Sequence, residues 1–260
     1  MSMNKSAEED FDLTAALEWV REQRLKVLGV AVVYVLFVQL GPRLLGTTKS
    51  SSSALRVATV FWNAANGAFS MWMLAQVTPA FLRAASRGWT YSICVVDDYY
   101  TGPTGRAAFL FVLSKLWELG DTVLLVIGGR PVRFLHWYHH AIVLLQVWWT
   151  YVDGGACVRW ATWMNVAVHS AMYPYFAMHA LGMRLPRWTA RCITTAQIAQ
   201  FLVGSIVLAF VFREAILLYR PCDTDPVAIA AHLFVYLSFL VLFSHFFYVS
   251  YVNKNKSKTI

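Results

Sequence analysis

The sequence predicts an all-α, polytopic membrane protein with seven transmembrane helices, and three observations lead to this fold class. Hydrophobic residues make up 58% of the 260 residues, charged residues make up only 14%, and long apolar runs recur along the chain. Because roughly 25% of the residues of an average soluble domain are charged, a soluble protein of this size could not enclose so many apolar side chains. The same composition excludes a disordered chain and a disulfide-dense secreted scaffold.

Seven apolar stretches have the length of a membrane-spanning helix, which needs about 20 residues. Continuous runs of this length exclude a β-barrel, because its strands are shorter and alternate polar with apolar residues. The stretches use most of the chain, so we expect one membrane domain over residues 1–260, with residues 1–26 before the first span and 253–260 after the last. The predicted spans are Val27–Leu45, Ala54–Val77, Ala107–Ile127, Phe134–Val152, Val158–Leu181, Ala190–Phe212 and Val227–Val252.

Basic residues are distributed unequally between the two sets of connections. The N-terminal segment and loops 2–3, 4–5 and 6–7 carry slightly more acidic than basic residues, whereas the other set carries only basic ones. Since cytosolic loops are enriched in Lys and Arg, the N-terminus is predicted to be lumenal and the C-terminal tail cytosolic. The net charge of +8 follows this topology and does not indicate nucleic-acid binding. The purely basic set holds Arg43, Lys49, Arg56, Arg130, Arg133, Arg184, Arg187, Arg191, Lys254, Lys256 and Lys258.

The end of the chain predicts the compartment. Lys256 and Lys258 precede Thr259-Ile260, which resembles the dilysine signal of endoplasmic-reticulum membrane proteins. The alternative is a generic basic stop after the last helix. Asn4 and Asn255 both begin glycosylation sequons, and only Asn4 is expected on the lumenal side.

The four cysteines fall at different ends of the predicted bundle. Cys94 and Cys222 lie in two lumenal loops, where disulfides form. Their spacing alone is equally consistent with a bridge and with two free thiols. Cys157 and Cys192 lie at opposite membrane faces, so we expect them not to pair with each other.

Four consecutive spans carry polar side chains, although ionisable groups at bilayer depth are costly and usually functional. In the third span, Lys115, Glu118 and Asp121 follow one another at intervals of three and are expected to pair along one helical stripe. A structural ion-pair ladder is the alternative reading. We expect the stripes of the four spans to face one shared cavity. The fifth and sixth spans contribute Asn165, His169, Tyr173, Gln197 and Gln200, again at intervals of three or four.

The fourth span begins with three histidines, His136, His139 and His140, whose spacing places them on one helical face. An unperturbed imidazole has a pKa of about 6.5, so it can accept a proton, and it can also carry an acyl group covalently. No cysteine lies in the polar stripes, which leaves imidazole as the candidate nucleophile. The other histidines, His179, His232 and His245, are isolated and are interpreted as structural.

A histidine cluster is also typical of a metal site. Membrane di-iron desaturases and hydroxylases use several histidine boxes with roughly six to eight ligands, whereas this chain offers one box and His169. A mononuclear zinc site needs only three histidines, but the HExxH pattern is absent. We therefore expect no metal. A seven-span receptor and a transporter remain as other classes, although the last span has no lysine to hold retinal and no internal repeat is visible.

Four motifs together resemble the ELO family of very-long-chain and polyunsaturated fatty-acid elongases, the 3-ketoacyl-CoA synthases of the endoplasmic reticulum. They are KLWELGDT (Lys115–Thr122), HWYHH (His136–His140), NVAVHSAMYPYF (Asn165–Phe176) and TTAQIAQF (Thr194–Phe201). Their order and spacing match the family, and the similarity runs from about Cys94 to Phe201. The form HWYHH resembles members that act on saturated and monounsaturated chains.

The resemblance implies a fold and an activity. Six of seven helices would enclose a substrate tunnel, and a disulfide would join Cys94 to Cys222. Long-chain acyl-CoA and malonyl-CoA would condense to a 3-ketoacyl-CoA, CO2 and CoA, with no cofactor beyond these substrates. The implied partners are membrane lipid and the two thioesters, with no nucleic acid, and the resemblance leaves open a homodimer and association with other enzymes of the elongation cycle.

The resemblance also implies roles for the polar residues. His139 would be the nucleophile that forms an acyl-imidazole, and His169 would act opposite it as a base or as the partner that holds the malonyl thioester. His136 and His140 would orient the site or stabilise an enolate. Lys115, Glu118 and Asp121 would fix the histidines and the CoA end. Hydrogen bonds around the thioester would come from Asn165, Tyr173, Gln197 and Gln200, and Arg133 and Arg187 would bind substrate at the basic cytosolic mouth.

Overall fold

The computed structural model describes residues 11–45 and 52–253, and these ranges are helical apart from short connections. No strand occurs in the described ranges. Two helices end in a π-helical turn, at η1 and η2. The elements are α1 Leu13–Leu45, α2 Ser53–Ser86, α3 Trp89–Cys94, α4 Gly102–Trp117, α5 Gly120–Ile127, α6 Phe134–Asp153, α7 Val158–Ala180, α8 Arg187–Phe212, η1 Arg213–Leu217, α9 Pro226–Phe247 and η2 Tyr248–Val252.

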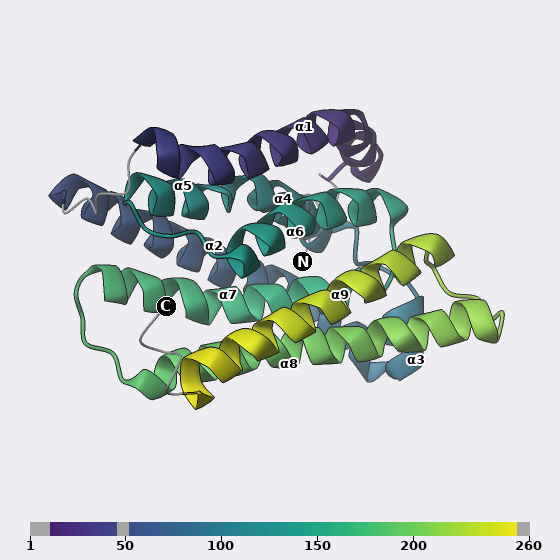
Figure 1. Ribbon diagram of the computed structural model, residues 1–260. Helices are drawn as coiled ribbons and strands as arrows, with labels where there is room; N and C mark the ends of the chain where they lie inside the picture. Colours follow the sequence, from purple (N-terminus) through teal and green to yellow (C-terminus); the bar gives the residue numbers. More distant parts are fainter. Residues whose placement is uncertain (1–10, 46–51, 254–260) are drawn as a thin grey trace, which may run out of the picture.

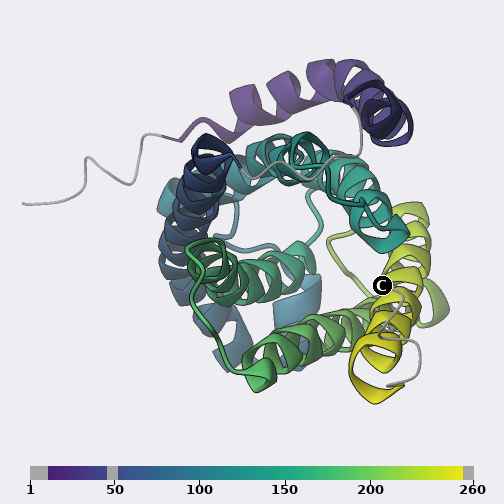
Figure 2. The same ribbon diagram turned by 60° about the vertical axis from the view of Figure 1, so that its left-hand side comes forward.

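The long helices run side by side and form a ring, with α1 outside it (Figures 1 and 2). Around the ring the order is α2, α4 with α5, α6, α9, α8 and α7, and α7 packs back against α2. The outer helix α1 rests on α5 and α6. Arg24 of α1 donates a hydrogen bond to the carbonyl of Trp149 in α6 and pairs with Asp153 at 3.4 Å.

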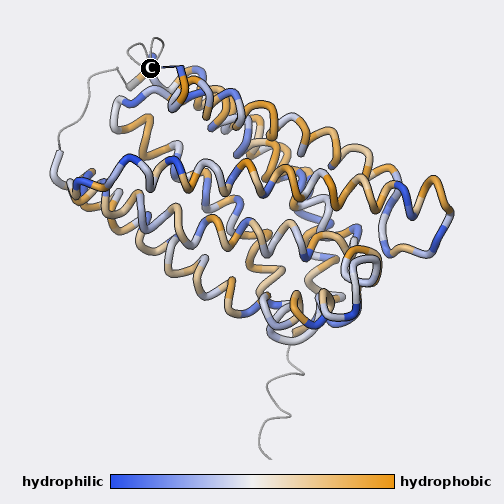
Figure 3. Tube along the Cα trace, turned by 90° about the horizontal axis from the view of Figure 1, so that it is seen from below, coloured by the Kyte–Doolittle hydropathy of each residue, from blue (hydrophilic) through white to orange (hydrophobic). Residues whose placement is uncertain are grey.

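Three helical stretches in the described part of the chain are long and apolar enough to cross a membrane, namely Leu13–Leu44, Arg187–Leu217 and Pro226–Val252. Their mean hydropathies are 1.9, 1.9 and 2.2. Figure 3 shows that hydrophobic residues run along the helices, while hydrophilic ones gather mostly toward the two ends of the bundle. All seven ranges predicted as spans are largely helical, and spans beyond these three stay a prediction.

Two predicted boundaries were wrong. The first helix begins at Leu13, well before Val27, because the charged residues between Glu18 and Lys26 interrupt the apolar run but are good helix formers. The second continues to Ser86 rather than ending at Val77, and it includes Pro79. Hydropathy marks the apolar part of a helix and not its ends.

The third predicted span, Ala107–Ile127, was expected to be continuous but is interrupted. α4 ends at Trp117, α5 begins at Gly120, and the amide of Asp121 donates to the carbonyl of Glu118 in a tighter turn. Gly120 lies directly against the Trp62 ring of α2, where a Cβ atom would come within 2.3 Å of that ring. The break therefore lets α2 approach closely at the position where the polar motif begins.

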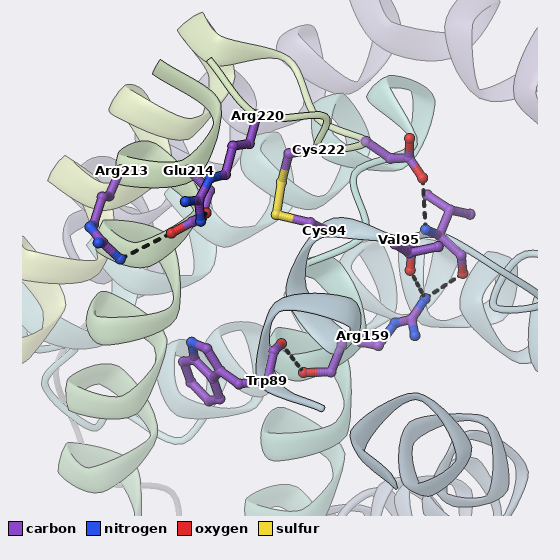
Figure 4. The surroundings of a disulfide bond; sticks show 11 residues. Trp89, Cys94, Val95, Arg159, Arg213, Glu214, Arg220 and Cys222 are labelled. Atoms are coloured by element: carbon purple, nitrogen blue, oxygen red, sulfur yellow. Dashed lines mark hydrogen bonds and ion pairs between the residues drawn. A yellow bond between two sulfur atoms is a disulfide. The ribbon is translucent and has the colours of Figure 1, made fainter. Parts of the chain in front are cut away.

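One end of the ring is tied together by a disulfide between Cys94 and Cys222, whose Cα atoms are 4.3 Å apart (Figure 4). Next to it, the amide of Asp223 donates to the carbonyl of Cys94, and the Asp223 carboxylate accepts from the amide of Val96. Arg159 of α7 is buried and donates to the carbonyls of Val95 and Val96. The expected bridge is confirmed.

The two other cysteines, Cys157 and Cys192, are free, as expected. Several sequence predictions lie outside the described residues. They are the sequons at Asn4 and Asn255 and the basic residues Lys49, Lys254, Lys256 and Lys258.

Candidate active site

The predicted site residues gather around one cavity inside the ring, which we call the outer cavity. It has a volume of about 420 Å³ and lies where α6 begins and α9 ends. Of the predicted residues, only Lys115 and Arg187 do not line it. Those that do are Glu118, Asp121, Arg133, His136, His139, His140, Asn165, His169, Tyr173, Gln197 and Gln200.

A second, narrower cavity continues toward the disulfide end, and we call it the inner cavity. Its walls are mainly apolar and come from α4, α6, α7, α8 and α9. Four residues line both cavities, namely His139, Asn165, Gln200 and Phe201. These four residues therefore mark the boundary between a polar chamber and an apolar one.

Lys115 lies behind the cavity wall and organises its polar groups. Its ammonium donates to Glu118 Oε1 at 2.7 Å and to Asn165 Oδ1 at 2.9 Å. All three side chains are buried, and Lys115 is only 3% exposed. The Asn165 amide nitrogen lies 3.3 Å from Nε2 of His169, whose Nδ1 is 3.8 Å from Glu118. Since an amide nitrogen can only donate, Nε2 accepts, and the hydrogen of His169 is on Nδ1, facing the carboxylate.

Asp121 does not extend the Lys115–Glu118 pair, so the expected three-member stripe is wrong at its last member. The helix break turns its carboxylate toward α2 and α7. It accepts hydrogen bonds from Trp62 Nε1 at 2.5 Å and from the Tyr173 hydroxyl at 3.0 Å. Asp121 thus joins two helices across the outer cavity wall.

The three histidines of α6 have different surroundings. His136 Nε2 shares a hydrogen bond with Thr122 at 2.9 Å, and Thr122 in turn contacts the Tyr34 hydroxyl of α1 at 2.8 Å. His140 packs against His136 with ring centroids 4.5 Å apart. His139 makes no hydrogen bond to another described residue and therefore has its nitrogens free for a ligand.

Aromatic rings enclose His139. Phe239 and Phe243 of α9 lie with their centroids 4.9 and 5.8 Å from the imidazole, and Phe201 of α8 lies at 6.2 Å. The rings exclude water from one side of the imidazole. No residue of α9 was predicted to belong to the site, because the sequence of this helix is largely apolar. Aromatic residues at 236, 239, 243 and 246 recur every three or four positions, and that spacing was the available signal.

The two predicted arginines differ in position. Arg133 immediately precedes α6, lines the outer cavity and lies over the Phe246 ring at 5.4 Å. Arg187 begins α8, is exposed and does not line the cavity. Arg191, one turn further on, lies over the Tyr251 ring at 5.7 Å, and Tyr251 does line it. Cationic groups therefore lie at this mouth, but Arg187 is not in its wall.

Gln197 and Gln200 lie one helical turn apart on α8. The Gln197 amide donates to the Met172 sulfur at 3.3 Å. Gln200 is buried and hydrogen-bonds to no other described residue, so its amide remains available at the boundary of the two cavities. In the described ranges, no group of three or more His, Cys, Asp or Glu side chains is arranged to hold a metal ion.

Comparison with known proteins identifies the family. The model of the GNS1/SUR4 (ELO) family matches residues 19–259. The chain belongs to the ELO family. Among relatives, the very long chain fatty acid elongase 6 of Gallus gallus is 35% identical over 249 residues, covering 95% of this chain and 92% of its own. The protein of that name from Homo sapiens is 35% identical over 255 residues, covering 97% and 94%. The fatty acid elongase 1 of Trypanosoma brucei brucei is 36% identical over 278 residues, covering 97% and 90%.

Membership of the ELO family agrees with the resemblance drawn from the four motifs. The match also extends beyond the motifs, because it includes most of α1 and all of α9. The α9 aromatic rings around His139 therefore belong to the same family domain as the histidine motif.

Proposed function

We propose that this chain is a fatty-acid elongase that condenses long-chain acyl-CoA with malonyl-CoA, giving a 3-ketoacyl-CoA, CO2 and CoA. Family membership and the names of the relatives support this activity. The observation that carries it is the position of His139, an imidazole without a hydrogen-bond partner among the described residues, at the boundary of a polar and an apolar cavity. An acyl-CoA likewise has a polar part, the CoA, and an apolar part, the acyl chain. Its thioester carbonyl joins the two parts and would therefore lie at this boundary.

The two cavities are proposed to form one tunnel within the ring, and the seven helical segments are proposed to span the membrane. The acyl chain would occupy the inner cavity, whose walls are apolar. The CoA would lie at the mouth of the outer cavity beside Arg133, which offers a planar cation suited to phosphate groups. The two thioesters and the side chains of the site supply the reacting groups, so we propose no further cofactor.

The first step forms an acyl-imidazole. The unprotonated nitrogen of the His139 imidazole attacks the thioester carbonyl, the carbon–sulfur bond breaks, and CoA leaves as a thiolate that takes a proton from solvent. The acylated ring keeps the hydrogen on its other nitrogen and carries a positive charge. Gln200 is the amide best placed to donate a hydrogen bond to the carbonyl oxygen as charge develops on it, because it lines both cavities and its amide has no other partner in the described ranges.

The second step transfers the acyl group to carbon. Malonyl-CoA loses CO2, and the resulting enolate attacks the acyl carbon, so that the carbon–nitrogen bond breaks and the imidazole is released. His169 would act in this step as a base or as the partner that holds the malonyl thioester. Its ring is fixed in place, because its Nε2 accepts a hydrogen bond from Asn165 and its Nδ1 faces Glu118. Lys115 would hold Glu118 and Asn165 in place.

The cellular setting is proposed from the charge distribution. The basic connections support an orientation with the outer cavity mouth on the cytosolic side and the Cys94–Cys222 end in the lumen of the endoplasmic reticulum. This orientation exposes the mouth to soluble CoA thioesters and the disulfide to an oxidising compartment. We also propose that the protein contacts other enzymes of the elongation cycle and forms a homodimer. Co-purification experiments test both contacts.

Single-turnover release of CoA tests the acyl-imidazole. The purified protein, mixed with acyl-CoA alone, should release a burst approaching one equivalent of CoA per site before malonyl-CoA is added. His139→Ala should abolish the burst, because it removes the acyl acceptor. Gln200→Ala should retain the amplitude of the burst but slow both the burst and turnover by about one to two orders of magnitude, because one hydrogen bond in a dry site is worth about 1–3 kcal/mol.

The outcomes separate mechanism from activity. Elongation without any burst in the unaltered protein would leave the activity in place and rule out the covalent intermediate. An unaltered burst in His139→Ala would show that another histidine is the nucleophile. No 3-keto product with any acyl-CoA would refute the proposed function itself.

A further inference from the structure

The far end of the inner cavity, at the disulfide side of the bundle, is not apolar. Three hydroxyl-bearing residues line it there, Tyr99, Tyr151 and Thr162, and each is at most 2% exposed. They come from three different elements, the α3–α4 connection, the last turn of α6 and the first turns of α7. The ring arrangement brings these elements to the same end, toward the right in Figure 1. Between this end and His139 the wall is largely apolar, with Phe111, Val143, Val147 and Leu208 among its residues.

The hydroxyl of Tyr151 is the clearest unexplained group. Its oxygen is buried and has no hydrogen-bond partner in the described part of the chain, although the side chain lines the cavity. Buried hydroxyls in proteins are nearly always hydrogen-bonded, and one that lacks a partner destabilises the fold. A polar group that enters the cavity beside Tyr151 would complete the hydrogen bonding of this hydroxyl.

A hydrogen-bond acceptor lies across the same end. Thr150 donates its hydroxyl hydrogen to the carbonyl of Gln146 at 2.6 Å, and its oxygen lies 2.8 Å from Nε2 of His232 in α9. Because a threonine has only one hydroxyl hydrogen, His232 donates from Nε2 and keeps Nδ1 as an acceptor. His232 lines the inner cavity, so the isolated histidine of the sequence is part of its wall.

We infer that this end of the inner cavity is a subsite for a hydroxyl group at or next to the methyl end of the acyl chain. The inference rests on the proposed function, because it assumes that an acyl chain fills the cavity. A hydroxyl both donates and accepts, so it matches His232 as acceptor and Tyr151 as donor. A methyl end offers neither group and leaves Tyr151 unsatisfied.

The distance from the reacting centre defines which chains would reach the subsite. His139 and Thr150 lie on α6 three helical turns apart, which corresponds to about 17 Å along the helix axis. A hydroxyl on a shorter chain would stop among the apolar side chains between them and lose hydrogen bonds to water without replacing them. The benefit of the hydroxyl is therefore confined to chains that span this distance.

Competition between matched substrates tests the inference. The purified protein is given pairs of acyl-CoA of equal length, one plain and one ω-hydroxylated, with malonyl-CoA, and the ratio of kcat/KM is measured as the chain is lengthened stepwise. The ratio should favour the plain chain at short lengths and rise by at least about tenfold once the hydroxyl reaches Tyr151, the change expected for one hydrogen bond.

Two variants and a control locate the effect. Tyr151→Phe and His232→Phe should each lower the ratio for the long pair by about tenfold. The ratio compares two substrates of equal length in the same variant, so any change in the elongation of both chains cancels. Tyr100→Phe is the matched control, because it removes a neighbouring buried hydroxyl that does not line the cavity and instead faces the Gly155 carbonyl. Its ratio should equal that of the unaltered protein.

Each other result overturns the inference. A ratio that favours the plain chain at every length, or that Tyr151→Phe leaves unchanged, would mean that the hydroxyls bind only water. Both outcomes would leave the proposed elongase activity intact. Failure to elongate plain chains would instead remove the proposed function, and this inference with it.

Discussion

At the scale of single residues, the buried ion pair of Lys115 and Glu118 is the interaction whose disruption we expect to cost the most stability. Both side chains are buried, and the ammonium also donates to Asn165. Removing one member of such a pair leaves the other charge buried and unpaired, which costs about 3–5 kcal/mol, whereas replacing both with apolar residues is often neutral. The pair holds the Asn165–His169 contact in place, so removing either charge also displaces His169.

A double-mutant cycle should therefore show strong coupling between the two residues. Glu118→Leu and Lys115→Met should each lower the melting temperature of the detergent-solubilised protein markedly, while the double variant should melt closer to the unaltered protein than either single variant does. Additive losses would show that the two charges are stabilised independently. All three variants should have low activity, because each loses the support of His169.

The site was largely predictable at this scale because its residues occur in short, dense motifs. Most predicted residues line one cavity, since helical spacing places them on common faces. Asp121 was misplaced because spacing assumes a continuous helix. Phe239, Phe243 and His232 were missed because aromatic residues and a lone histidine in an apolar helix are more often packing than function.

At the scale of elements, the interruption between α4 and α5 depends on a residue without a side chain. Gly120 allows the Trp62 ring to approach, and that ring stacks on Trp117 at 4.4 Å while its Nε1 donates to Asp121. The sequence did not reveal the break, because the charged residues around it are also compatible with a polar stripe on one continuous helix. Only the contact between two helices distant in sequence explains it.

Gly120→Ala should destabilise the protein. The new Cβ would lie 2.3 Å from the Trp62 ring, so α2 or the ring must shift, and overpacking of this kind costs about 1–3 kcal/mol. Gly29→Ala is the control, because no atom lies within 4 Å of the Cβ position there and alanine favours the helix. We expect thermal melting in detergent to fall for Gly120→Ala and to stay level or rise for Gly29→Ala. Equal melting temperatures would show that the Trp62 contact is readily relieved.

At the scale of the whole molecule, the disulfide joins segments 128 residues apart. A cross-link that closes a loop of this size restricts the unfolded chain and stabilises the fold by up to about 5 kcal/mol in the chain-entropy account. Cys222→Ser should therefore lower the melting temperature. Cys192→Ser, which changes an exposed free thiol, should not. A Cys222→Ser protein that melts with the unaltered one would show that the hydrogen bonds of Asp223 and Arg159 suffice at this end.

The sequence predicted the helical class and the positions of all seven helical segments, since the composition and apolar runs are unambiguous. It could not predict how the helices pack, because the ring order depends on contacts such as those of α2 with α7 and of α6 with α9. The proposed orientation across the membrane rests on the distribution of charge.

The chain's own cysteines test that orientation. Cys192 near the start of α8 is exposed, Cys157 is buried, and Cys94 and Cys222 are bonded, so only one thiol in the described structure is accessible to a polar reagent. In sealed microsomes with the cytosolic face outward, a membrane-impermeant maleimide should label the protein without detergent, because α8 begins on the proposed cytosolic side. Cys192→Ser should abolish the labelling. Labelling that required permeabilisation would invert the orientation, place the disulfide end in the reducing cytosol and move the outer cavity mouth away from cytosolic CoA thioesters.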